Sequence, residues 1–197
     1  MVTMTTDDKA LRNERVFEQE LLPHADALNT FAYHLTYNSD DAEDLVQETY
    51  MKAFRFIDKY QVGTNAKAWL FKILKNGFIN QYRKKSKAPA KVDIDEVTNF
   101  MNNEDAQHSG AGYTDLREEM FQHMMGDEVT MAINSLPVNF RIVILLCDIE
   151  GFTYEEIAKI IDIPIGTVRS RLFRARNLLK KQLANYAASL GYEDKRK

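Results

Sequence analysis

The chain has 197 residues, 45% hydrophobic and 28% charged, with a net charge of −3, which predicts a soluble globular protein of one or two domains and excludes disordered and collagen-like chains. A single cysteine, Cys147, excludes a disulfide framework and a cysteine-based zinc ribbon. The longest apolar run, residues 142–147, falls far short of the about 20 residues that span a bilayer, and the polar N-terminus has no signal-peptide core, so we expect a reduced, cytoplasmic protein.

The first part of the chain has the pattern of amphipathic helices. Apolar residues recur every three or four positions over residues 17–35, with Pro23 as a kink or early-turn position. A second helix is predicted to begin near Ser39, with acidic residues in its first turn, and to continue to residue 57. At this helical spacing we expect Phe56 to lie in the core.

A loop over residues 61–65 precedes a third predicted helix, which ends near Lys85. Seven basic residues and no acidic one lie between residues 59 and 86. The basic run is either a solvated helix face or a surface for phosphates. One face of this helix would hold side chains that suit phosphates and base edges, namely Lys72, Asn76, Asn80 and Arg83. Tyr60, before the loop, is either a core residue or a ring that stacks on an unpaired base.

Residues 87–126 lose the helical pattern. They contain Pro89, a Gly-rich stretch and eight acidic residues against three basic ones. A segment of this length is typical of a linker between two domains. No alternation typical of a strand occurs along the chain, so we predict an all-α fold of two small helical domains joined by a flexible acidic linker.

The C-terminal part predicts a helix-turn-helix. Thr153 and Glu156 form a capping box at the start of a short helix, residues 162–164 form the turn, and a longer helix follows. Residues 163–181 hold six basic residues and no acidic one. The other interpretation is an α-hairpin whose second helix is basic only for solubility.

The second helix of a helix-turn-helix enters the major groove of DNA. Its apolar stripe contains Val168, Leu172 and Ala175. Facing away from that stripe we expect Thr167, Arg169, Ser170, Arg171, Phe173 and Arg174, which suit base edges and thymine methyls. Arg169, Arg176 and Lys180 are predicted phosphate contacts.

Signals for catalysis are missing from the sequence. No phosphate-binding glycine loop, nucleophile elbow or zinc-protease motif occurs. The carboxylates between residues 40 and 48 suggest an acid–base or metal site, but no partner base lies near them in the sequence. We therefore predict no catalytic residue, no metal site, no cofactor and no small-molecule substrate.

Three motifs in register point to one family. They are DAEDLVQETY at residues 41–50, AWLFKI at residues 68–73 and IGTVRSRLFRAR at residues 165–176. Together they resemble the extracytoplasmic-function (ECF) sigma factors of bacterial RNA polymerase, in the sigma-70 family. The resemblance covers residues 17–85 and 129–183.

The resemblance implies a domain plan and a function. Residues 1–86 would be sigma region 2, residues 87–126 the acidic linker, residues 127–190 sigma region 4 with the helix-turn-helix, and residues 191–197 a charged tail. Such a transcription initiation factor binds core RNA polymerase, recognises the minus-ten and minus-thirty-five elements of duplex and melted promoter DNA, and pairs with an anti-sigma factor. The linker would run toward the RNA exit path of the polymerase.

The resemblance also implies site residues. The contacts to core polymerase would be Asp44, Leu45, Gln47, Glu48 and Arg55. The minus-ten contacts would be Tyr60, Thr64, Asn65, Lys72, Asn76, Asn80, Arg83 and Lys84. The minus-thirty-five contacts would be Thr167, Arg169, Ser170, Arg171, Phe173, Arg174 and Arg176. Asn80 stands where many members have Asp, so their minus-ten preference does not transfer to this chain.

Two other classes of protein remain open from the sequence. A stand-alone helix-turn-helix regulator would occupy an operator, but it would not need the acidic motif at residues 41–50 or the first basic helix. A scaffold that binds only protein would not need the arginine-rich helix.

Overall fold

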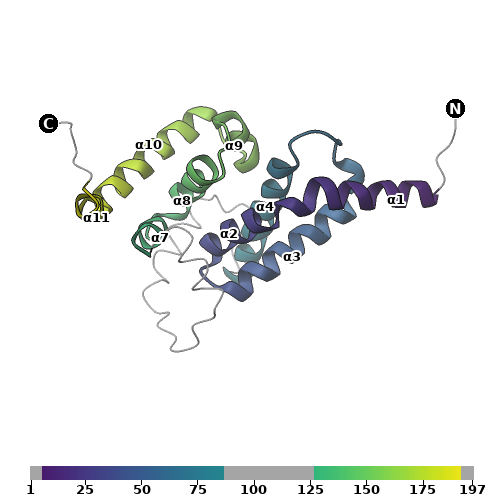
Figure 1. Ribbon diagram of the computed structural model, residues 1–197, viewed down its shortest axis with the longest axis horizontal. Coiled ribbons are helices and arrows are strands. Elements are labelled where there is room, and N and C mark those ends of the chain that lie inside the picture. Colours follow the sequence, from purple (N-terminus) through teal and green to yellow (C-terminus); the bar gives the residue numbers. More distant parts are fainter. Residues whose placement is uncertain (1–5, 87–126, 192–197) are drawn as a thin grey trace. The chain divides into compact units, whose positions relative to one another are not determined.

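The computed structural model describes residues 6–86 and 127–191, and every regular element in these two ranges is a helix (Figure 1). The all-α prediction is confirmed. The chain divides into two compact units, and the predicted linker falls outside the described ranges. Each unit is described by itself.

Over residues 6–86, the N-terminal unit consists of four α-helices and three short turns of helix. In chain order they are α1 (Thr6–Val16), a π-helical turn η1 (Phe17–Leu21), a 3-10 turn η2 (Leu22–His24), α2 (Ala25–Thr36), α3 (Ser39–Arg55), a 3-10 turn η3 (Ile57–Lys59) and α4 (Ala66–Ser86). Pro23 lies in the first turn of η2, between η1 and α2, which agrees with its prediction as a kink or early-turn position.

The start of α3 is fixed by a side-chain cap. The helix begins at Ser39 as predicted, and Asn38 is its N-cap: the Asn38 Oδ1 accepts a hydrogen bond from the Asp41 N–H at 2.9 Å. Tyr37, at φ 54°, ends α2 in the left-handed conformation. The two helices therefore reverse direction over two residues, Tyr37 and Asn38, and pack against each other.

The core of the N-terminal unit lies where α2, α3 and α4 meet. The Phe31 and Phe71 rings are 5.0 Å apart in this core. Leu45 is completely buried, and a Cβ added at Gly77 of α4 would lie 3.2 Å from its Cδ1, so the glycine allows the close approach of α3 and α4. The predicted polymerase contact at Leu45 is therefore wrong, because the side chain is a core residue.

Phe56 also differs from its predicted place. Its side chain is 44% exposed, and the Lys59 Nζ lies 4.9 Å from the centre of its ring. The reason is that α3 ends at Arg55, so Phe56 no longer follows the helical stripe that buries the residues before it.

Over residues 127–191, the C-terminal unit contains five α-helices, one of which continues into a π-helical turn. They are α7 (Asp127–Asn134), α8 (Val138–Ile144) with the π turn η4 (Leu145–Ile149), α9 (Tyr154–Ile161), α10 (Ile165–Gln182) and α11 (Ala184–Ser189). The capping box is confirmed: Glu156 Oε2 accepts from the Thr153 N–H at 2.9 Å, and Thr153 Oγ1 accepts from the Glu156 N–H at 3.3 Å. The α9–turn–α10 arrangement is the predicted helix-turn-helix, with Asp162 at φ 60° in the turn.

A buried cation holds the end of α7. Arg141 of α8 is only 2% exposed, and its guanidinium donates to the carbonyl oxygens of Asn134 at 2.7 Å and Leu136 at 2.9 Å. Carbonyls at the end of a helix have no partner within that helix. Arg141 therefore stabilises the turn between α7 and α8.

Arg141→Met should lower the free energy of unfolding of the C-terminal unit by about 2–6 kcal/mol, because two carbonyls lose their donor at about 1–3 kcal/mol each. Urea denaturation followed by circular dichroism measures this loss. Trp69, the single tryptophan, lies in the N-terminal unit, so the midpoint of its fluorescence transition should not move. Arg174→Met, at an exposed position, should change stability by less than about 0.5 kcal/mol. Equal stability of the two variants would contradict this role.

Candidate nucleic-acid and protein interfaces

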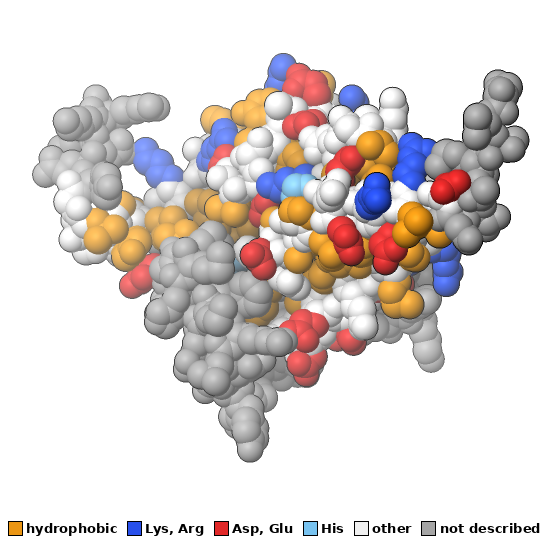
Figure 2. All heavy atoms as spheres, turned by 45° about the vertical axis from the view of Figure 1, so that its right-hand side comes forward, with side chains coloured by type: hydrophobic (Ala, Val, Ile, Leu, Met, Phe, Trp, Pro, Cys, Tyr) orange, Lys and Arg blue, Asp and Glu red, His pale blue; other side chains and the backbone are white. Residues whose placement is uncertain are grey.

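The outer face of α3 combines charged and apolar side chains. Asp44, Gln47 and Arg55 are exposed, and so are Met51 (63%) and Phe54 (52%). Figure 2 shows hydrophobic and acidic side chains side by side on one face of the molecule. Exposed apolar residues rimmed by polar ones are typical of a protein-binding surface. The sequence prediction missed Met51 and Phe54, although both follow Asp44 and Gln47 at helical spacing.

Glu48 belongs to the unit's own contacts. Its Oε1 lies 2.7 Å from the Lys52 Nζ, and its Oε2 accepts from the Gln81 Nε2 at 3.0 Å. The carboxylate therefore connects α3 to α4. This geometry favours a structural role for Glu48 over the predicted contact with polymerase.

The exposed face of α4 holds three of the predicted DNA contacts. Lys72, Asn76 and Asn80 are all exposed, as their spacing predicted. Two other lysines of the basic run do not belong to this face. Lys75 is buried, and the Lys67 Nζ lies 5.9 Å from the centre of the Phe71 ring. Arg83 and Lys84 fall on the part of α4 whose side chains are not described.

The loop between η3 and α4 is anchored at both ends. Tyr60 is buried, and its ring packs on Trp69 with 5.1 Å between ring centres. Burial, and then its hydrogen bond to Glu20, raise the pKa of Tyr60 to about 12. At the other end the Asn65 Oδ1 accepts from the Ala68 N–H at 2.8 Å and caps α4. Of the two roles left open by the sequence, the burial of Tyr60 favours the core residue, which anchors the loop, over a ring that stacks on a base.

Thr64 and Asn65 are the predicted loop contacts that remain accessible. Both side chains are exposed, together with Gln61 and Val62. The Thr64 Oγ1 also donates to the Gln61 carbonyl at 2.7 Å, which tightens the loop. The loop thus presents short polar side chains on a fixed backbone.

The outer face of α10 carries the predicted groove-reading side chains, with one exception. Arg169, Ser170, Phe173 and Arg174 are exposed, Phe173 to 69%, and Thr167 is partly exposed. Arg171 is only 9% exposed, so the prediction that it faces away from the apolar stripe is wrong. Its position explains the burial, because three and four residues separate it from the buried Val168 and Ala175.

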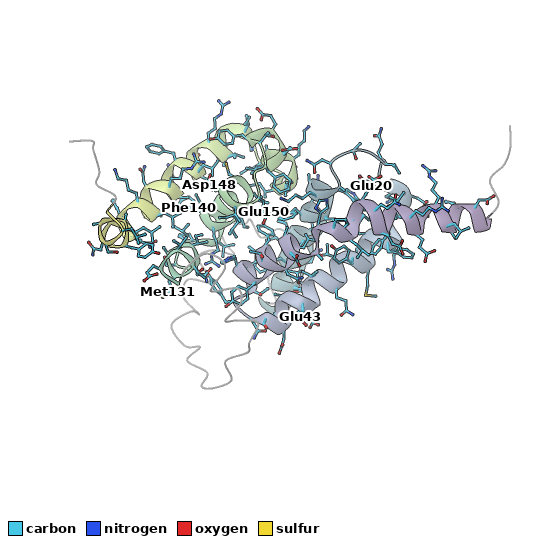
Figure 3. The ribbon with its side chains drawn as sticks, viewed as in Figure 1. Glu20, Glu43, Met131, Phe140, Asp148 and Glu150 are labelled. Carbon is cyan, nitrogen blue, oxygen red and sulfur yellow. The ribbon has the colours of Figure 1, made fainter. Side chains whose placement is uncertain are left out.

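Arg176 is held by an internal carboxylate. Its guanidinium donates two hydrogen bonds to Asp148, at 2.5 and 3.1 Å, and these bonds raise the pKa of the guanidinium above its ordinary value. One guanidinium nitrogen also lies 3.5 Å from the Cys147 Sγ. Figure 3 shows Asp148 beside α10. The pair joins α10 to η4 and favours a structural role for Arg176 over the predicted phosphate contact. Burial, the largest cause, and the Asp148 carboxylate raise the pKa of the Cys147 thiol.

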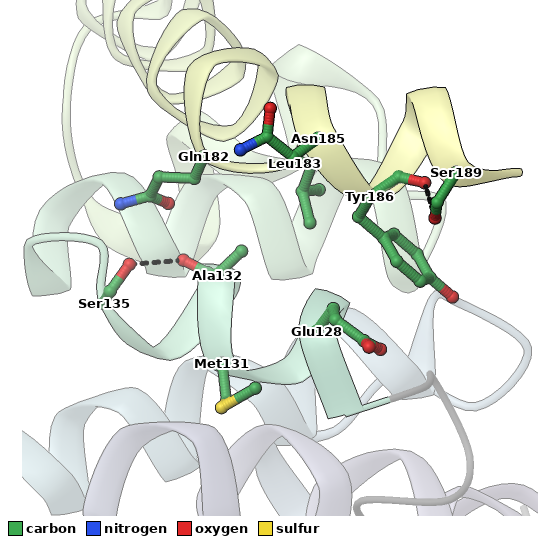
Figure 4. Close-up of a pocket in the computed structure, with 9 residues that line it drawn as sticks. All are labelled: Glu128, Met131, Ala132, Ser135, Gln182, Leu183, Asn185, Tyr186 and Ser189. Atoms are coloured by element: carbon green, nitrogen blue, oxygen red, sulfur yellow. Dashed lines mark hydrogen bonds between the residues drawn. The ribbon is translucent and has the colours of Figure 1, made fainter.

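A groove of about 590 Å³ lies between α7, the end of α10 and α11 (Figure 4). Met131, Leu183 and Tyr186 form part of its lining. Nothing in the sequence pattern pointed to this groove, because its walls come from helices about 50 residues apart.

Within the described ranges, no three His, Cys, Asp or Glu side chains gather as metal ligands. The same ranges contain no helix that is long and apolar enough to cross a membrane.

Together these surfaces define a class of protein. A helix-turn-helix with an arginine-rich second helix is a DNA-binding module. A second helical unit adds a basic face on α4 and a mixed acidic and apolar face on α3. The chain is thus a helical DNA-binding protein with a separate surface for another protein.

Comparison with known proteins identifies the family. The model of sigma-70 region 2 matches residues 22–88, and the model of sigma-70 region 4 matches residues 126–179. The chain belongs to the sigma-70 family, among its ECF sigma factors, which direct RNA polymerase to promoters. The resemblance seen in the three motifs is confirmed.

Several relatives carry this name. The ECF sigma factor EcfG of Rhodopseudomonas palustris is 37% identical over 164 residues, which cover 83% of each chain. SigE of Mycolicibacterium smegmatis is 36% identical over 169 residues, and the match spans 84% of this chain but 60% of that relative. The sigma-E factor of Escherichia coli is 34% identical over 74% of this chain and 75% of its own.

Two solved structures share the fold. The sigma factor RpoE of Bartonella quintana, solved with the anti-sigma factor NepR, is 36% identical with a TM-score of 0.63 over 85% of this chain and 96% of that one. CnrH, solved with the cytosolic domain of CnrY, has a TM-score of 0.61 over 91% of this chain and 94% of that one. At 22% identity, CnrH supports the fold alone.

Proposed function

We propose that this chain is a transcription initiation factor that binds core RNA polymerase and directs it to promoters. The observation that carries the proposal is that one short chain holds the mixed face of α3, the basic face of α4 and a helix-turn-helix. A stand-alone regulator needs only the last of these. On this proposal the chain acts as a binding factor in the cytoplasm and catalyses no reaction of its own.

The two units have different tasks in this proposal. Residues 1–86 form region 2, which binds the polymerase and the minus-ten element, and residues 127–190 form region 4, which binds the minus-thirty-five element. Residues 87–126 link them, and residues 191–197 form the tail. The described helices and the two matched ranges support this division.

The polymerase would contact Asp44, Gln47 and Arg55 on α3, together with Met51 and Phe54. An anti-sigma factor is a further partner, because the relative from Bartonella quintana was solved with one.

Promoter DNA would contact both units. The loop around Thr64 and Asn65 would receive an unpaired base, and Lys72, Asn76 and Asn80 of α4 would follow the DNA. In the C-terminal unit, Phe173 and Arg174 of α10 would reach base edges, with Arg169 on a phosphate. The exposure of these side chains supports these roles.

In vitro transcription tests the proposal. Core RNA polymerase from the same bacterium, incubated with genomic fragments, should produce new defined transcripts only when this protein is added. Specific binding of the protein to the same fragments without any effect of core enzyme would instead support the stand-alone regulator.

The free protein should bind duplex promoter DNA poorly and gain specificity in the holoenzyme. The linker is acidic, and its residues can compete with phosphates for the basic faces within a Debye length of about 8–10 Å. A band-shift titration with and without core enzyme measures this difference. A variant with Asn or Gln at Asp93, Asp95, Glu96, Glu104 and Asp105 should bind more tightly without core enzyme. Tight, promoter-specific binding by the unmodified free protein would contradict this mechanism.

A further inference from the structure

One carboxylate connects the N-terminal helices to the loop before α4. Glu20 lies in η1, the π-helical turn after α1 (Figure 3). Its Oε2 accepts a hydrogen bond from the Tyr60 Oη at 2.5 Å and another from the Gly63 N–H at 3.0 Å. These partners are 40 and 43 residues away in the sequence. A single oxygen atom thus holds both the start and the middle of the loop.

The contact between Glu20 and Gly63 fixes the backbone conformation of an exposed loop. Gly63, at φ 79°, is in the left-handed region, and its neighbours Val62 and Thr64 are exposed. Exposed loops of this kind sample many conformations unless their backbone groups are bound. The bond from the Gly63 N–H to Glu20 selects the conformation in which the loop side chains point outward.

A second contact holds the segment just before the loop. Asp58 of η3 accepts from the Lys9 Nζ at 2.8 Å and from the Asn13 Nδ2 at 3.3 Å, both on α1. A groove of about 400 Å³ lies between α1, η1 and Val62. α1 and η1 therefore act together as a support behind the loop, and Glu20 is the part that reaches the loop itself.

The chemistry of Glu20 suits a fixed acceptor. The hydrogen bonds from Tyr60, and then from the Gly63 N–H, lower the pKa of this carboxyl below its ordinary value of 4.5. The group is ionised at neutral pH and loses its bonds only as the pH falls through that lowered pKa. A bare carboxylate beside DNA would repel phosphates, but here it is turned onto the protein's own donors.

We infer that Glu20 is a positioning residue: it holds the loop Gln61–Asn65 in the one conformation that receives an unpaired promoter base. This inference rests on the proposed function. The physical basis is preorganisation. A loop that is already ordered before binding loses no further conformational entropy when the base binds, so its affinity for the base is higher. Glu20 itself does not touch the DNA in this role.

Three substitutions separate positioning from folding. Glu20→Ala removes both hydrogen bonds, and Glu20→Gln keeps an acceptor of the same shape. Tyr60→Phe removes the Tyr60 hydroxyl, with its bonds to Glu20 and to the Thr64 carbonyl, but retains the ring against Trp69. Glu18→Ala, on the same turn and exposed, is the matched control. Each variant is made in the full chain and checked by circular dichroism.

The first readout is the loop itself. Hydrogen exchange of the peptide that contains Gly63 should become about tenfold faster in Glu20→Ala, with Glu20→Gln close to the original protein and Glu18→Ala unchanged. This measurement needs neither polymerase nor DNA.

The second readout is base selection by the holoenzyme. Open complexes formed on a library with a randomised minus-ten element are sequenced. Suppose that the loop of Glu20→Ala is in the base-binding conformation about a tenth of the time. The enrichment of the preferred base at the loop-bound position among the sequenced open complexes should then fall about tenfold. Adding Tyr60→Phe to Glu20→Ala should cost less than Tyr60→Phe costs in the original protein, because the bond between Tyr60 and Glu20 is already gone and only the bond from the Tyr60 Oη to the Thr64 carbonyl at 3.1 Å remains to be lost. Recognition of the minus-thirty-five element and binding of core enzyme should not change.

The outcomes are distinct. Unchanged exchange in Glu20→Ala, or faster exchange with unchanged base selection, would overturn the inference while leaving the proposed function intact. An equal loss of selection at both promoter elements would also overturn it, because that pattern indicates general instability. Failure of the original protein to direct core polymerase to any promoter would overturn the proposed function and this inference with it.

Discussion

Asp44→Lys should abolish co-purification of this chain with core RNA polymerase. Asp44 is exposed on α3, at the N-terminal end of the face that includes Gln47 and Met51. Reversing one charge in a desolvated contact costs about 2–5 kcal/mol, which is a loss of about thirtyfold or more in affinity. Affinity capture of core enzyme on the tagged protein, followed by a fluorescence titration, measures the effect. The far-UV circular dichroism of the variant should match the original.

Two further variants sharpen this test. Met51→Asp should weaken core binding as well, because it places a charge in the apolar part of the same face. Glu18→Lys changes the net charge by the same amount as Asp44→Lys, but on η1, and should leave core binding unchanged. Glu48 is unsuited to the test, because its bonds to Lys52 and Gln81 make any loss hard to assign. Full core binding by both α3 variants would refute α3 as the polymerase surface.

Arg174→Ala should reduce transcription from the native promoter and flatten its dependence on the sequence of the minus-thirty-five element. A bidentate contact between arginine and guanine contributes about 1–3 kcal/mol of discrimination. This corresponds to a roughly 5- to 150-fold smaller difference between the native and a mutated upstream element. Transcription from a set of promoters with single changes in that element measures the discrimination directly.

Arg169→Ala is the matched control for base reading, since both arginines are exposed on α10. As a phosphate contact, Arg169 should weaken binding to all sequences about equally and lower the slope of log affinity against log salt by about 1. The buried Arg171 and the ion-paired Arg176 do not serve here, because their loss would disturb the unit itself. If Arg174→Ala also weakened all sequences equally, Arg174 would be a phosphate contact.

Local patterns in the sequence were enough to determine the helices and much of their exposed faces. The capping box of Thr153 and Glu156 and the shared face of Lys72, Asn76 and Asn80 depend on residues three or four positions apart. Such residues are neighbours on any helix, so their relation follows from the helical period alone. The three sigma motifs are equally local, and for this reason the family was visible in the sequence.

The tertiary structure decided which of those residues are available. Leu45 and Arg171 belong to motifs rich in charged residues, at residues 41–50 and 165–176, but both side chains are buried, because a helix can pack more than one face against its neighbours. The bonds of Glu20 to the loop and of Arg176 to Asp148 join residues 28 to 43 positions apart. No helical period relates residues at such distances, since only the packing of one element against another brings them together.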